Sequence, residues 1–115
     1  MSNCIFCKII NGEIPSKQVY ADEDVVVFHD ISPKAPVHVL VVPKKHVESL
    51  REVEEADTII LSKLLLTVKQ VGETLGISEK GYKVVVNNGP DSGQLVYHLH
   101  FHLLGGWKGK AGWEV

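Results

Sequence analysis

The sequence of 115 residues has little cysteine, few aromatic residues and almost no excess charge of either sign. It contains two cysteines, 7% aromatic residues and a formal net charge of −2. So small a charge gives no electrostatic reason to expect a nucleic acid or an anionic membrane as partner. No apolar run approaches the roughly 20 residues of a membrane-spanning helix. The first residues lack the charged and apolar segments of a secretory signal, so a cytoplasmic protein is expected.

The chain also lacks internal repeats and linkers rich in proline, glycine or serine. Its length suits one domain with a modest core and is too short for two. We therefore expect residues 1–115 to form a single domain.

Turn residues and apolar patterns predict an α+β domain with a mainly antiparallel, five-stranded sheet. A short helix begins near Cys4 and ends at Asn11-Gly12, and a long helix runs from Glu54 to Leu75, with Gly76 as its stop. Residues 18–30 predict a hairpin around an acidic turn. The remaining strands are expected within residues 37–43, 82–88 and 97–106.

The apolar residues of the long helix cover more of its surface than one core-facing stripe. Two interpretations are open: the domain itself covers the helix, or the second apolar side meets another subunit. These positions are Ile59, Ile60, Leu61, Leu64, Leu65, Leu66, Val68, Val71 and Leu75.

Three of the six histidines, His98, His100 and His102, occupy every second position of "YHLHFHLLGG". On a strand they would all point to one side, with Leu99 and Phe101 pointing to the other. The outer two would lie about 13 Å apart along the backbone. One zinc ion needs its nitrogen ligands within about 2.1 Å, so the three imidazoles are expected to have different roles. The middle one is a candidate nucleophile, because an imidazole is largely neutral near pH 7.

The preceding segment "NNGPDSGQ", residues 87–94, is a candidate phosphate loop. Its glycines allow backbone N–H groups to approach an oxyanion, and its side-chain amides add neutral donors. The same composition also makes an ordinary surface turn, but its place beside the histidines favours the anion site.

The run from Gly93 to Gly106 resembles the signature of the histidine triad (HIT) nucleotide-binding proteins, most closely their Hint branch of nucleoside phosphoramidate hydrolases. Residues 4–46 resemble the N-terminal half of that branch. The resemblance implies cleavage of the P–N bond of purine nucleoside 5′-phosphoramidates, or of related AMP conjugates such as aminoacyl adenylates. In the family the middle histidine, here His100, forms a covalent nucleotidyl-histidine. The resemblance also implies a homodimer, in which the sheets of the two subunits join and their long helices pack together.

The resemblance assigns further site residues. Asn87, Gly93, Gln94 and His102 surround the phosphate, and Asp30 binds the ribose hydroxyls. His98 is the first histidine of the triad, and His38 lies against the triad and supports it through hydrogen bonds. Plain core packing is the alternative for the apolar residues matched to the base and ribose pocket. The pocket positions are Ile5, Phe6, Ile9, Ile14, Phe28, His29 and Ile31.

Leu95 departs from the family pattern, since Hint proteins usually carry a serine there that helps the leaving amine depart. Leucine can donate no proton, so His102 or a water takes over that step, or cleavage is slow. The final segment "WKGKAGWEV" also diverges from Hint tails, which puts leaving-group preference in doubt.

Cys4 and Cys7 have a C-x-x-C spacing that permits a structural zinc site, two inert thiols or a redox pair. A redox role needs a thioredoxin-like context, which is missing. Zinc needs four ligands, and His46 and His98 are the candidates to complete the set. The related galactose-1-phosphate uridylyltransferases use a comparable set. Such a metal would be structural, and the chemistry would require no cofactor.

Three other functions are open besides phosphoramidate hydrolysis. The first is a nucleotide-binding regulatory protein with little turnover, which Leu95 favours. The second is hydrolysis of dinucleoside polyphosphates, which the Gly105-Gly106 ending and the Hint-like N-terminal half disfavour. The third is a zinc-binding module, which the strand geometry disfavours.

Overall fold

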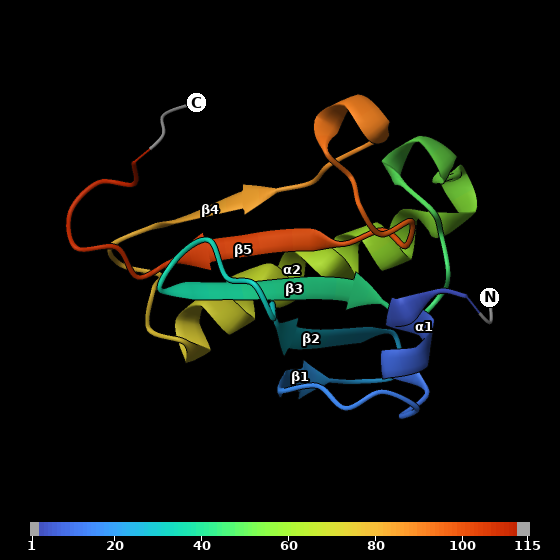
Figure 1. Cartoon of the computed structure of the whole chain (residues 1–115), viewed down its shortest axis with the longest axis horizontal. Coiled ribbons are helices and arrows are strands. Elements are labelled where there is room, and N and C mark those ends of the chain that lie inside the picture. Colours follow the sequence, from blue (N-terminus) through green and yellow to red (C-terminus); the bar gives the residue numbers. More distant parts are fainter. Residues whose placement is uncertain (1–2, 113–115) are drawn as a thin grey trace.

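The computed structural model describes residues 3–112, and residues 1–2 and 113–115, including the end of the divergent tail, lie outside the described part. The described residues form a five-stranded sheet with one long helix behind it and a short helix in front (Figure 1). The helices and strands are α1 (Ile5–Ile10), β1 (Gln18–Ala21), β2 (Val25–His29), β3 (Val37–Pro43), α2 (Thr58–Thr74), β4 (Tyr82–Val85) and β5 (Phe101–Gly105). Three 3₁₀ turns are η1 (Leu50–Glu52), η2 (Glu55–Asp57) and η3 (Pro90–Ser92).

The sheet is antiparallel throughout, in the order β1-β2-β3-β5-β4, which confirms the predicted α+β class. The β1–β2 hairpin forms where predicted, because the Asp22 carboxylate accepts the backbone N–H groups of Asp24 and Val25, both at 2.8 Å. β3 lies at the centre and β4 at one edge, where it pairs with β5.

The last strand is shorter than predicted. We expected it to start at Tyr97, but β5 begins at Phe101, so His98 and His100 precede it. The segment before β5 is held by a loop instead of a neighbouring strand, since the Leu99 N–H donates to the Val47 carbonyl at 2.6 Å. The side chains still alternate, and Leu99 and Phe101 enter the core on the α2 side.

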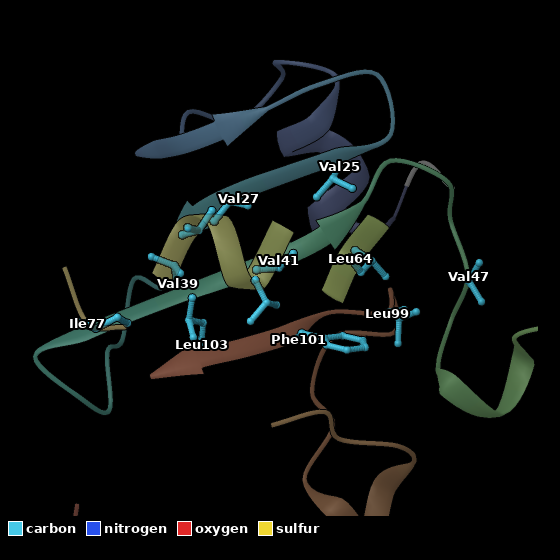
Figure 2. Close-up of a cluster of buried hydrophobic side chains, with 12 residues drawn as sticks. Val25, Val27, Val39, Val41, Val47, Leu64, Ile77, Leu99, Phe101 and Leu103 are labelled. Carbon is cyan, nitrogen blue, oxygen red and sulfur yellow. The ribbon is translucent and has the colours of Figure 1, made fainter. Parts of the chain in front are cut away.

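The main core lies between the sheet and α2, as Figure 2 shows. β-branched and leucine side chains from alternate strand positions meet one side of the helix, as the period-2 pattern requires. Its buried members are Val25, Val27, Val39, Val41, Val47, Leu64, Val68, Val71, Ile77, Leu99, Phe101 and Leu103. The other face of the sheet carries a smaller cluster beneath α1, formed by Phe6, Val26, Phe28, Leu40 and Val42.

Helix α2 begins at Thr58, four residues later than predicted, because the chain first makes the turn η2. There the Asp57 carboxylate accepts the Glu54 N–H at 3.0 Å. The helix ends beside Gly76, whose φ of +73° is a conformation that glycine adopts readily, as predicted.

The apolar surface of α2 is only partly covered by this chain. Ile59, Leu65 and Leu66 are 71%, 56% and 60% exposed. The interpretation that the domain covers the whole helix is therefore wrong for these three side chains. Among residues 3–112, no helix has the length and apolar character to span a membrane.

Candidate active site

The three histidines lie on the face of the sheet opposite α2, beside α1. His98 and His100 are buried and His102 is half-buried. The Phe6 ring of α1 meets His98 and His100 edge-on, with centroids 6.0 and 5.0 Å apart, and the rings of His100 and His102 are 5.0 Å apart. The predicted single-sided row is therefore present, although only His102 belongs to a strand.

His100 is held in one tautomer by the chain itself. Its Nδ1 lies 2.7 Å from the His98 carbonyl oxygen, and a carbonyl only accepts, so Nδ1 carries the proton. Burial lowers the pKa of His100. The ring is therefore neutral at pH 7 and its Nε2 has a free lone pair, which is the state a nucleophile requires.

His98 has the opposite arrangement. Its Nε2 lies 2.7 Å from the Pro43 carbonyl and donates to it, which leaves the Nδ1 lone pair free. Burial lowers the pKa of His98 to about 4, so this lone pair stays unprotonated. A backbone carbonyl on the second ring nitrogen is the usual support of a metal-binding histidine.

The Nδ1 atom of His98 faces Cys4, Cys7 and His46, the other three predicted metal ligands. All four ligand atoms lie within 4.8 Å of one another. His98 Nδ1 is 3.4 Å from Cys4 Sγ, 3.5 Å from Cys7 Sγ and 3.2 Å from His46 Nδ1. Cys7 Sγ is also 3.3 Å from His46 Nδ1.

These separations fit a tetrahedral zinc site. Bond lengths of about 2.3 Å to sulfur and 2.0–2.1 Å to nitrogen imply edges of roughly 3.6 Å between S and N and roughly 3.3 Å between N and N. Both cysteines are free thiols, and burial raises the pKa of Cys7 to about 11. Without a metal, Cys7 would be an unreactive thiol, because the thiolate is the reactive form.

A second cluster joins Asp30, His38 and His102. The Lys34 backbone N–H donates to His38 Nδ1 at 3.0 Å, so the proton of neutral His38 is on Nε2. That Nε2 lies 2.9 Å from His102 Nδ1 and 3.5 Å from an Asp30 carboxylate oxygen. His38 therefore donates to His102, whose own proton is on Nε2.

Burial lowers the pKa of His102 to about 4 and also lowers the pKa of His38. Both rings are neutral near pH 7. His102 and His38 line a cavity of about 290 Å³ with Lys34, Val85, Asn87 and Leu104. A larger hollow, of about 840 Å³, lies between the end of α2 and the C-terminal segment, and no predicted site residue lines it.

The candidate phosphate loop is ordered by its own polar groups. The Gln94 amide group donates to the carbonyls of Glu48 at 2.8 Å and Val96 at 3.1 Å, and its oxygen accepts the Gly89 N–H at 2.8 Å. The Asn87 amide donates to the Ser92 carbonyl at 2.9 Å. These bonds fix the loop, and the roles of Asn87, Gly93 and Gln94 at the phosphate stay predictions.

The predicted base and ribose residues divide by burial. Phe6 and Phe28 are buried and in contact, with ring centroids 5.4 Å apart. Ile9 and Ile14 are half-buried, whereas Ile31 is 96% exposed and Ile5 44%. His29 is exposed, and the other Asp30 oxygen accepts the Ser32 N–H at 2.8 Å.

Two contributors were missed at the level of sequence. The Lys34 N–H and the Pro43 carbonyl each determine which nitrogen of a histidine carries the proton. Both are backbone groups, so no side-chain pattern could have identified them.

Comparison with known proteins defines the class. The profile of the HIT domain family matches residues 11–109. An uncharacterized HIT-like protein of Synechococcus elongatus is 50% identical over 102 residues, covering 89% of each chain. The structure is similar to a HIT family hydrolase from Clostridium thermocellum, with a TM-score of 0.93, 47% identity and 96% of each chain covered.

A third similar protein is the histidine triad nucleotide-binding protein of Candida albicans, with a TM-score of 0.81 and 39% identity. The match covers 95% of this chain and 85% of that one. The chain belongs to the HIT family, whose fold it has throughout its described part.

Proposed function

We propose that this protein hydrolyses the P–N bond of purine nucleoside 5′-phosphoramidates, or related AMP conjugates, as the Hint branch of its family does. One observation carries the proposal: His100 is buried and neutral, with its Nδ1 proton bonded to the His98 carbonyl at 2.7 Å. Its Nε2 lone pair is directed by that bond rather than by rotation in solvent.

In the first step His100 Nε2 bonds to the α-phosphorus and the P–N bond breaks, releasing the amine. In the second step water attacks the phosphorus, the N–P bond breaks, and AMP leaves with His100 regenerated. The buried ring also disfavours the charged imidazolium that covalent attachment creates. This raises the energy of the intermediate and favours its hydrolysis.

The leaving amine needs a proton, and Leu95 cannot supply it. Its side chain is 91% exposed and has no donor. His102 is the proposed donor, because its Nε2 carries a proton and its Nδ1 is held by His38 at 2.9 Å. A bound phosphoryl anion raises the pKa of His102 from its low value. The ring then takes up a proton from solvent at Nδ1, which displaces the hydrogen bond from His38, and gives its Nε2 proton to the departing amine. The water that attacks in the second step returns a proton to Nε2, and Nδ1 releases its proton to solvent.

The cluster of Cys4, Cys7, His46 and His98 is proposed to bind structural zinc. The S–N and N–N separations and the Pro43 carbonyl on His98 support this assignment. Bound zinc would tie α1 to the loop after β3, and it would supply no step of the hydrolysis.

A homodimer is the proposed assembly. Three apolar side chains of α2 are exposed in the single chain, and the nearby edge strand β4 exposes Val84 by 41% (Figure 1). A second copy that packs α2 on α2 and extends the sheet at β4 would cover both. Sedimentation analysis of wild type and of Leu66→Glu tests this assembly, and a monomeric wild type would contradict it.

The decisive experiment measures AMP release from adenosine 5′-phosphoramidate. We expect His100→Ala to lower kcat by on the order of 10⁴-fold or more, as removal of other nucleophiles does. Lys44→Ala changes only an exposed side chain, so it is the matched control and should keep full activity. Equal rates in wild type and His100→Ala would disprove the nucleophile.

A nucleotide-binding regulatory protein is the second candidate, and Leu95 is the observation that favours it. Tight AMP binding by the wild type without turnover would support that function. Leu95→Ser then tests whether the missing hydroxyl is the cause, because it should restore cleavage.

A further inference from the structure

Helix α1 contributes both to the proposed zinc site, formed by Cys4, Cys7, His46 and His98, and to the wall of the candidate active site. Cys4 caps the helix, and its sulfur accepts the Cys7 N–H at 3.3 Å. Phe6 stands between the two cysteines in the sequence. The helix has six residues, and isolated helices shorter than about 12 residues are marginal in water. Phe6 is its one buried residue. Its position therefore depends on contacts with the rest of the fold.

Phe6 connects this helix to the nucleophile. Its ring meets His100 at 5.0 Å and Phe28 at 5.4 Å, both edge-on. A displacement of α1 would therefore remove one wall of the pocket predicted for the nucleotide and one side of the packing around His100.

His98 makes a second connection from the same cluster. Its Nδ1 faces the sulfur atoms of Cys4 and Cys7, at 3.4 and 3.5 Å. Its carbonyl oxygen accepts the Nδ1 proton of His100 at 2.7 Å. The residue that completes the donor set thus also supplies the backbone group that orients the nucleophile.

We propose that metal occupancy of the Cys4–Cys7–His46–His98 cluster determines nucleotide affinity by holding α1 and the His98 carbonyl against His100. Cys4, Cys7 and His98 are positioning residues in this role, since they touch the nucleophile's surroundings and not the reacting atoms. The inference rests on the zinc site and the nucleotide-binding function proposed above.

The expected size of the effect follows from populations. A ligand that binds only the form with α1 in place has an apparent Kd equal to its intrinsic Kd divided by the fraction of that form. If α1 is in place in about one tenth of metal-free molecules, the apparent Kd for AMP rises about tenfold.

The test is AMP titration by calorimetry on the full chain, with zinc bound and after chelation. Imidazole resonances of ¹⁵N-labelled histidine report the His100 Nδ1 proton in parallel. We expect chelation to raise the AMP Kd at least about tenfold, and to broaden the His100 Nδ1–H signal. His46→Ala, which removes a ligand from outside α1, should have the same effect in the presence of zinc. Lys44→Ala, two residues earlier in the same loop, should bind AMP as the wild type does.

Three results would overturn the proposal: no zinc uptake, an AMP Kd unaffected by chelation, or a His46→Ala variant that loses zinc but keeps wild-type affinity. Chelation of the wild type needs no substitution, so the test stands even if His46→Ala does not fold. Turnover plays no part in these measurements. A protein that binds AMP in a metal-dependent way without hydrolysing phosphoramidates would disprove the proposed reaction and leave this inference intact.

Discussion

Two clusters flank His100, and they differ in what their histidines present. Both bring ligand-type atoms within 4.8 Å of one another. In the first, the Pro43 carbonyl accepts a hydrogen bond from the Nε2–H of His98, so the Nδ1 lone pair of His98 points into the cluster. In the second, the Lys34 N–H occupies the Nδ1 lone pair of His38, so a proton points into the cluster.

That difference determines the chemistry of each cluster. Imidazole lone pairs and thiolate sulfurs can bind a metal, whereas the proton between His38 and His102 makes a hydrogen-bonded pair that we propose acts as a relay. A single backbone group per cluster makes the choice. The two clusters can therefore be separated experimentally.

Metal removal should have the largest effect, and only through the first cluster. Free zinc at a thousand times its Kd stabilises a folded protein by about 4 kcal/mol. Chelation should thus lower Tm by more than about 10 °C, as calorimetry would measure. His38→Asn should retain this zinc dependence. A Tm that is independent of zinc would contradict the proposal that the first cluster binds zinc.

Loss of the relay should mainly affect catalysis. His102→Asn removes the proposed donor to the leaving amine, and we expect kcat to fall about 10²-fold, the usual range for a general acid. Zinc content, measured by metal analysis, should be unchanged. A leaving group that needs no protonation, such as a nitrophenolate, should restore most of the rate in this variant. Equal losses with both substrates would contradict the assignment.

The Lys34 backbone can be tested by a matched pair of substitutions. Lys34→Pro removes the N–H that fixes the His38 tautomer, whereas Lys34→Ala keeps it. We expect Lys34→Pro to lower kcat about tenfold, corresponding to about 1.4 kcal/mol, with Lys34→Ala near wild type. Melting curves of both variants check that the fold is intact. Similar activity in the pair would show that this N–H does not control the relay.

Acid should weaken the protein by a smaller amount through His102. Its pKa is about 4 in the folded state, against about 6.5 when unfolded. The unfolded chain therefore binds a proton more readily, and the free energy of unfolding falls as pH drops from 6.5 to 4. For this half-exposed ring we expect about 1–2 kcal/mol. Urea denaturation should show a weaker pH dependence in His102→Asn, and an unchanged dependence would contradict the assignment.

The sequence predicted much of this arrangement. The hairpin, the central strand β3 and the assignment of Leu99 and Phe101 to the core followed from residue pattern and were confirmed. The C-x-x-C spacing singled out Cys4 and Cys7, with His46 and His98 as the candidates to complete four ligands, and the structure brings the four together. The predicted starts of β5 and α2 were wrong. The Leu99 N–H donates to Val47, far away in the sequence, and a local bond joins Glu54 to Asp57, and these bonds outweighed the apolar periodicity.

The sequence by itself determined which residue types face each other, since alternation along a strand follows from backbone geometry. Only the tertiary structure decided which ring nitrogen of His38, His98 and His100 carries the proton. The Pro43 carbonyl, the Lys34 N–H and the His98 carbonyl fix the protons of His98, His38 and His100. Every residue has such a carbonyl, and every residue but proline has such an N–H. Their roles come from position in the fold, because hydrogen bonds depend on where the chain places them.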